Sequence, residues 1–161
     1  MPQLSVLVAC EKVIVDRVGV PSLISIFQRM NVQLQMPEQP PHNATIPITW
    51  AVFVLWQHSE DELDKEFIQR VEVDAPDGKN FISAETKFKI TDVDDRQSKN
   101  HIIINGLPVW AEGFVTVKVW LEGVEGSSHT YLFFLKFVPS NGEKSIGESK
   151  PDPSGGSFGD R

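Results

Sequence analysis

Hydrophobic and polar residues alternate along most of this chain up to Val138. Within residues 113–122, three valines and a leucine occupy one side of an extended chain, and the other side carries Phe114, Thr116, Lys118 and Trp120. This repeat of two residues is that of a β-strand, whereas a helix repeats every 3.6 residues. The pattern therefore predicts an all-β protein.

The alternation is interrupted by turn residues, and it predicts strands over residues 4–16, 22–34, 45–56, 67–75, 81–90, 102–104, 115–121 and 130–138. Residues 76–78, Pro-Asp-Gly, predict a turn because proline fixes φ and glycine accepts a positive φ. Residues 45–56 are apolar on both faces, which predicts a strand in mid-sheet with its second face covered. The acidic residues 58–66 predict one helical turn or a solvated loop, and residues 92–100 predict a polar loop.

About eight short strands without a helical segment of about ten residues are typical of an antiparallel β-sandwich. The topology is expected to be immunoglobulin-like or C2-like, and a closed barrel is the alternative. A true immunoglobulin domain is not supported, because it needs a second cysteine and Cys10 is the only one. We expect one sandwich domain over residues 1–138. Residues 139–161 are rich in glycine, serine, proline and charge, which predicts a disordered tail.

The chain has 161 residues, the size of one ordinary domain, and a net charge of −7. A single cysteine forms no intramolecular disulfide, so a reducing cytoplasm is the expected location. The basic residues are scattered instead of clustering with aromatic residues, so we expect no nucleic-acid partner. No apolar stretch approaches the roughly 18 residues of a membrane span, so we expect no membrane partner. Residues 7–10 resemble a lipoprotein cleavage site, but the short apolar run without a preceding positive charge favours a first strand.

Motifs of catalysis are missing from the sequence. Within residues 1–138 there is no Gly-x-Ser-x-Gly nucleophile elbow, the four histidines lack the spacing of zinc ligands, and Cys10 lies in an apolar strand where an inert thiol is expected. We therefore predict no catalytic residue and no cofactor. An EF-hand loop beginning at Asp92 fails, because Gln97 and Ile103 stand where glycine and glutamate are needed. The remaining metal hypothesis is a calcium site made by two loops at one end of the sandwich, from Asp74, Asp77, Asp92, Asp94 and Asp95.

Two sets of aromatic residues suggest binding surfaces. Trp110 and Trp120 could stack on a sugar, as in carbohydrate-binding sandwiches, although tryptophan in such a chain is more often a core or interface residue. The last two strands carry an apolar surplus on their outward side, at Phe114, Trp120, Leu132 and Phe134. A soluble monomer seldom leaves such a patch bare, so we expect another layer of the fold or a second subunit to cover it. The second possibility predicts a homodimer.

The opening of the sequence, with Cys10-Glu11 followed by Ser-Leu-Ile-Ser-Ile-Phe at residues 22–27, resembles a family of small uncharacterised bacterial proteins. In that family, a strand with a Cys-acidic pair leads through a glycine turn into a Ser-Leu-x-x-Ile-Phe strand. Residues 76–78 and the Glu-Gly-Phe of residues 112–114 agree with it, and the resemblance covers residues 4–138. It implies a bacterial origin and a sandwich fold, and it carries over no catalytic residue.

The function that the sequence favours is that of a non-enzymatic binding or assembly protein whose protein partner it does not name. Two alternatives stay open. One is a calcium-dependent or carbohydrate-binding sandwich, and the other is an enzyme without a recognisable motif.

Overall fold

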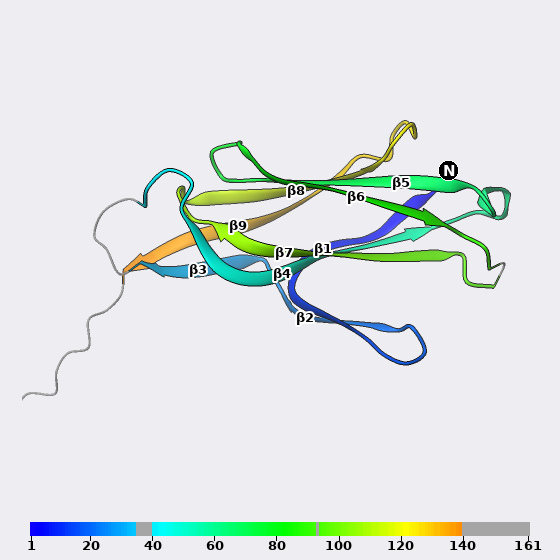
Figure 1. Ribbon diagram of the computed structural model, residues 1–161, viewed down its shortest axis with the longest axis horizontal. Coiled ribbons are helices and arrows are strands. Elements are labelled where there is room, and N and C mark those ends of the chain that lie inside the picture. The colour runs from blue at the N-terminus through cyan, green and yellow to red at the C-terminus, as the bar shows by residue number, and fades with distance from the viewer. Residues whose placement is uncertain (35–39, 93, 140–161) are drawn as a thin grey trace, which may run out of the picture.

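The structure is a computed structural model that describes residues 1–34, 40–92 and 94–139. These residues form nine strands and one 3₁₀ helix (Figure 1), with bounds Gln3–Val15 (β1), Pro21–Ile26 (β2), Arg29–Leu34 (β3), Thr45–Gln57 (β4), Glu60–Glu62 (η1), Glu66–Asp74 (β5), Asn80–Lys89 (β6), Gln97–Pro108 (β7), Gly113–Leu121 (β8) and His129–Pro139 (β9). Within these residues there is no helix long and apolar enough to cross a membrane. The tail predicted to be disordered lies, from residue 140 onward, outside the described residues.

Two sheets face each other and enclose the core (Figure 1). Sheet A has the strand order β2-β1-β4-β7, and sheet B has the order β3-β9-β8-β5-β6. The all-β sandwich predicted from the sequence is thus confirmed. Neighbouring strands are antiparallel except β3 and β9, which pair in parallel. The pairing of β4 with β7, and of β5 and β9 with β8, is that of strands B, C, E, F and G in an immunoglobulin-type sandwich.

The strand predicted over residues 22–34 is in fact two strands, and this prediction was wrong. β2 ends at Ile26 and β3 begins at Arg29, and Ser25, near this break, has a φ of 53°, outside the β region. The backbone N–H of Phe27 donates to Ala9 in sheet A, whereas the carbonyl of Gln28 accepts from Phe134 in sheet B. The chain therefore passes from one sheet to the other between two consecutive residues, and it reaches β9 in the parallel direction.

β7 begins at Gln97, inside the stretch predicted to be a loop. Its polar first residues pair with the end of β4, where Ser98 lies opposite Trp56 and Gln97 opposite Gln57. A strand needs only a partner for its backbone, so a polar sequence extends the ladder when the neighbouring strand is long enough. The length of β4, not the sequence of residues 97–101, sets the start of this strand.

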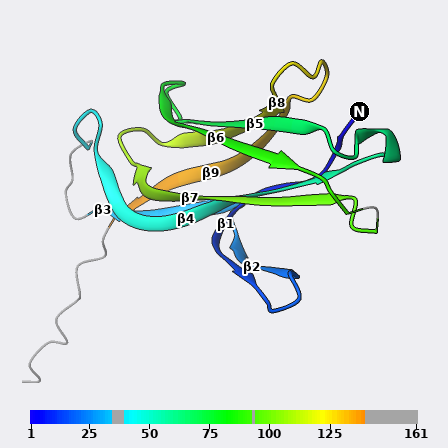
Figure 2. The same ribbon diagram turned by 45° about the vertical axis from the view of Figure 1, so that its right-hand side comes forward.

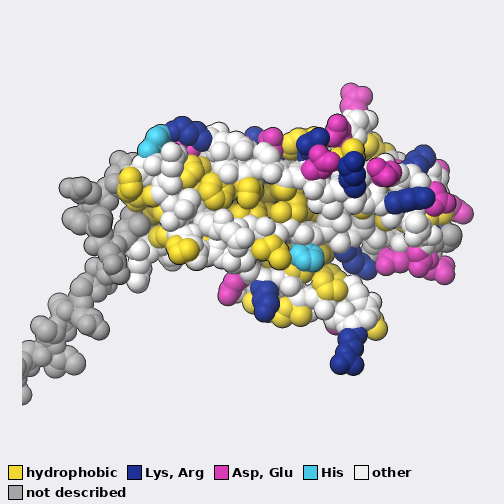
Figure 3. All heavy atoms as spheres, in the orientation of Figure 1, with side chains coloured by type: hydrophobic (Ala, Val, Ile, Leu, Met, Phe, Trp, Pro, Cys, Tyr) yellow, Lys and Arg dark blue, Asp and Glu magenta, His cyan; other side chains and the backbone are white. Residues whose placement is uncertain are grey.

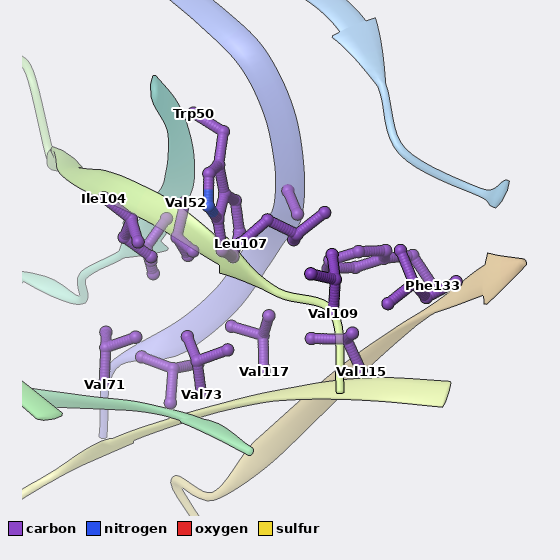
Figure 4. Packing of buried hydrophobic residues seen from close by; sticks show 14 of the residues in the cluster. Trp50, Val52, Val71, Val73, Ile104, Leu107, Val109, Val115, Val117 and Phe133 are labelled. Carbon is purple, nitrogen blue, oxygen red and sulfur yellow. The ribbon is translucent and has the colours of Figure 1, made fainter. Parts of the chain in front are cut away.

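The core consists of the inward side chains of both sheets, and Figure 4 shows Trp50, Val52, Val117 and Phe133 among them. The ring of Trp50 packs edge-on against Phe133 with 5.7 Å between ring centroids, and its Nε1 donates to the carbonyl of Gly106 at 2.8 Å. This bond satisfies the polar atom of a fully buried indole. On the opposite face of β4, Phe53 is only 3% exposed, so the prediction that both faces of this strand are buried is confirmed.

β1 extends beyond its pairing with β4. From Gln3 to Cys10 it pairs with β4, and its remaining residues pair only with β2. The hairpin of residues 11–26, which we call the arm, therefore projects from the body of the sandwich, as the two views of Figures 1 and 2 show. At its tip the Oδ1 of Asp16 accepts hydrogen bonds from the backbone N–H groups of Val18 and Val20 at 2.9 and 2.8 Å. Gly19 supplies the positive φ, 81°, that closes the turn.

Candidate protein-binding surface

The outer face of sheet B carries an apolar patch on β8 and β9. These strands pair with Phe114 opposite Phe134 and Thr116 opposite Leu132. Because alternate residues of a strand point to opposite faces, the residues between them fill the core and these point outward. Phe114 and Leu132 are 56% and 50% exposed, and the ring of Phe114 meets Phe134 edge-to-face at 5.1 Å between centroids. Three of the four interface residues predicted from the sequence thus form one patch, which we call the sheet B patch.

Basic residues flank the sheet B patch. Arg29, the first residue of β3, lies opposite Phe134 in the parallel ladder, and its guanidinium carbon is 5.8 Å from the centroid of that ring. This distance is within the range of a cation–π contact. Lys136 follows Phe134 by two residues, so it shares the outer face, and it is exposed. The patch therefore has an aromatic centre and a cationic rim, in a chain whose net charge is −7.

Trp120 does not belong to this patch. It lies six residues along β8 from Phe114, a distance of about 20 Å in an extended strand. It lines a shallow hollow of about 300 Å³ together with Arg70 and Glu85. The Nη2 of Arg70 donates to Glu122 at 2.9 Å and its Nη1 lies 3.0 Å from Glu85, so charged groups surround the indole. The prediction that all four residues form a single surface needs this correction, and the reason is their spacing along one strand.

No further layer of the described residues covers the sheet B patch, as the exposure of Phe114 and Leu132 shows. Of the two covers predicted from the sequence, another layer of the fold is therefore wrong for the described part of the chain. The other cover, a second subunit, stays a prediction.

The five aspartates of the calcium hypothesis lie at opposite ends of the sandwich, so that hypothesis is wrong. Asp74 and Asp77 flank the turn before β6, and the other three aspartates follow its far end, about 30 Å away along ten residues. Asp74 lies 2.6 Å from the Nζ of Lys118, and Asp77 lies 3.3 Å from that of Lys79. In the part of the chain that the structure describes, no group of three or more His, Cys, Asp or Glu residues could hold a metal ion.

The tryptophans of the carbohydrate hypothesis do not form a sugar platform either. Trp110 is 7% exposed, and its ring lies 6.2 Å from that of Phe81, between centroids. Trp120 is half-buried in its charged hollow. A sugar needs an open aromatic face, and the buried Trp110 presents none.

Another hollow, of about 770 Å³, lies at the end of the sandwich and is lined in part by Gln57, His58, Asp94 and Asp95. The Nε2 of His58 is 3.2 Å from the Oγ of Ser98, and its Nδ1 is 3.7 Å from the Oε2 of Glu62. Serine, histidine and carboxylate stand here in the order of a hydrolase triad. The sequence reasoning missed this cluster because it joins β7 to the loop after β4, and the only local signal is the four-residue spacing of His58 and Glu62.

Burial decides how this cluster behaves. The side chain of His58 is fully buried, and its ring packs at 5.4 Å from Phe67 and 5.7 Å from Phe88, between centroids. Burial lowers the pKa of the His58 imidazole and so favours its neutral form, although Glu62 opposes this effect. Ser98 is 6% exposed, so its hydroxyl faces the interior and not the hollow. His58, Glu62 and Ser98 therefore form a buried polar cluster at the end of the core, which we call the plug.

Glu62 is the charged member of this plug and is 3% exposed. Burial raises the pKa of its carboxyl, but hydrogen bonds from the N-terminal ammonium at 2.6 Å and from the backbone N–H of Ser59 at 2.9 Å hold that pKa below its usual value overall. Because the Glu62 carboxylate accepts both hydrogen bonds, its charge is stabilised although it is buried. Glu62 thereby holds η1 at the end of the sandwich.

No protein-family model matches this chain, and no curated protein is significantly similar to it.

Proposed function

We propose that this protein is a non-enzymatic binding or assembly protein of the bacterial cytoplasm and that it holds a protein partner on the sheet B patch. The exposure of Phe114 and Leu132 on the outer face of the β8–β9 ladder is the observation that carries this proposal. Completing the burial of these two half-exposed side chains contributes roughly 1 to 1.5 kcal/mol each. Clustered aromatic residues of this kind form the energetic centre of protein interfaces.

The rim of the patch supports a partner of particular chemistry. Arg29 and Lys136 stand beside the aromatic centre and favour carboxylates at the edge of the partner's surface. The partner surface that fits is therefore apolar at its centre and acidic at its rim. The single buried cysteine and the resemblance of residues 4–138 to small bacterial proteins support the bacterial cytoplasm as its location.

Site-specific photo-crosslinking tests this function. A benzophenone amino acid at position 114 should give one discrete adduct in the cells from which the protein comes, and mass spectrometry should identify a protein in it. The same probe at Lys87, an exposed residue of β6, is the matched control and should give no such adduct. The Leu132→Glu variant should lose the adduct. Equal labelling from both positions, or none from position 114, contradicts the proposal.

The order of groups around His58 favours an enzyme as the second candidate function. A fluorophosphonate probe reacts with an activated serine, so it discriminates between the two candidates. If the plug is structural, the intact protein stays unlabelled. Labelling that disappears in Ser98→Ala would establish a serine hydrolase and displace the proposal of a non-enzymatic protein.

A further inference from the structure

The arm exposes a large apolar surface. Six of its aliphatic side chains are at least 40% exposed, namely Ile14, Val15, Val18, Val20, Ile24 and Ile26. They lie on both faces of the hairpin and at its tip, since Ile14 and Val15 are consecutive residues of one strand, and together they present on the order of 500 Å² of apolar surface to solvent. An isolated hairpin of two strands is only marginally stable in water, so the exposure of this apolar surface is unfavourable. The arm therefore needs an apolar surface to lie against.

Such a surface exists where the arm leaves the body. A hollow of about 360 Å³, which we call the notch, lies between Val13 at the base of the arm and Ala51, His101 and Ile103 on the outer face of sheet A. Ile103 is 61% exposed. The volume is about ten times that of a water molecule in the liquid, so the notch can accept an aliphatic hairpin tip. Figure 3 shows the arm as a separate lobe below the body.

The arm cannot fill its own notch. Val18 at the tip lies seven residues beyond Glu11, which is at the notch, and the chain between them is extended to Val15. An extended segment of that length spans roughly 20 Å. The tip, with Val18 82% exposed, and the notch are therefore two apolar features of one chain that do not meet within it.

The charged residues of the arm are placed so that two antiparallel arms would attract each other. Its base carries Glu11 and Lys12, and its tip carries Asp16 and Arg17, all of them exposed. Among the described residues, neither Glu11, Lys12 nor Arg17 forms an ion pair. Two arms that run in opposite directions place each base against the other tip. This sets Glu11 near the partner's Arg17 and Lys12 near the partner's Asp16, so the pattern is complementary to itself.

We propose that the occupant of the notch is a second copy of this chain, in a two-fold dimer in which two arms run antiparallel and each tip enters the notch of the other copy. A two-fold interface uses the same surface on both subunits, which is what a tip and a notch on one chain provide. A second copy covers the face of the arm that it meets, so the arm supplies a part of the roughly 800 Å² that each partner contributes to an interface of standard size. Ile103 and the rest of the notch add to it.

This dimer does not rest on the function proposed for the sheet B patch, because the arm belongs to sheet A. The two surfaces lie on different sheets, so both can be occupied at once. The dimer would then present two sheet B patches, which increases the avidity for a partner that carries repeated sites.

A mixed-disulfide experiment with the full chain tests the dimer. Val18→Cys in one tagged chain and Ile103→Cys in another should link the two chains on mild oxidation into a species of twice 18.1 kDa. Both positions are exposed, so the substitutions leave the core intact, and the native Cys10 is fully buried. Val18→Cys mixed with Lys87→Cys on sheet B is the matched control and should stay unlinked. No link, or equal linking in both mixtures, overturns the proposal.

Charge reversal gives a second measurement by sedimentation equilibrium. Glu11→Lys and Arg17→Glu should each weaken the dimer about tenfold or more, because each brings like charges together twice in a two-fold pair. The double variant should restore the dimer, and this rescue must act between chains since the two residues are far apart within one. Absence of rescue overturns the proposed arrangement. Leu132→Glu should leave the dimer unchanged; if it alone abolishes the dimer, the sheet B patch is the self-association surface and the arm is not.

Discussion

Acidification from pH 7.5 to 5.5 is expected to destabilise the protein through His58 alone by up to about 1.4 kcal/mol. Burial lowers the pKa of this imidazole in the folded state, whereas in the unfolded chain it titrates near its ordinary value of about 6.5. Above that value neither state binds the proton. Below it the unfolded state binds a proton that the folded state does not bind. The free energy of unfolding therefore decreases as the pH falls toward the folded pKa. One proton over one pH unit below 6.5 corresponds to about 1.4 kcal/mol, which is the upper limit for this interval.

Urea denaturation of the native sequence and of His58→Gln at pH 7.5, 6.5 and 5.5 measures this effect. Glutamine does not titrate, so the variant should show a smaller loss of unfolding free energy between the two extremes, by as much as about 1.4 kcal/mol. The comparison uses only the change with pH, so a different absolute stability of the variant does not affect it. An NMR titration of the His58 imidazole provides an independent check. Equal pH dependence of both proteins, or a His58 pKa at or above 6.5, would refute the reasoning.

Three further outcomes are expected. Phe133→Ala, at a fully buried ring, should cost about 3 to 5 kcal/mol in urea denaturation, whereas Phe114→Ala on the exposed face should stay within about 0.5 kcal/mol; similar losses would contradict the assigned faces. Calorimetric titration with calcium should show no saturable heat, because the aspartates do not converge; a saturable heat that is lost in a double alanine variant at Asp92 and Asp94 would contradict this. Truncation after Pro139 should leave the melting temperature within a degree or two, and a fall of about ten degrees would show that the removed residues stabilise the sandwich.

Local pattern was sufficient for most strands and for the direction of their side chains. The alternation around Val115 correctly separates the buried face of β8 from the face that carries Phe114, because each strand's pleat sends successive side chains to opposite sides whatever its neighbours are. The Pro-Asp-Gly turn of residues 76–78 was also predictable, and Gly78 adopts the expected positive φ of 80°. These features depend on residues that are adjacent in the chain.

The candidate surfaces were only partly predictable, since alternation tells which face a residue points to and not how far along that face it lies from another. Phe114 and Trp120 share a face, but the ladder places them about 20 Å apart in different surroundings. The plug at His58 gave almost no signal, because Ser98 reaches it from a strand 40 residues further along the chain. The arm was hidden too, since pairing with β4 ends at Cys10 although both strands continue past this pair, which the sequence of β1 does not predict.

The sequence by itself determined that this chain is a β-sandwich and that one cysteine leaves it without an intramolecular disulfide. Tertiary structure alone decided that residues 22–34 divide between two sheets, that the aspartate loops lie at opposite ends, and that the arm stands free of the body. The physical reason is the range of the interactions. Side-chain alternation and turn chemistry act over a few residues. Strand pairing instead joins segments that are distant in the chain, through backbone hydrogen bonds that nearly every residue type can form.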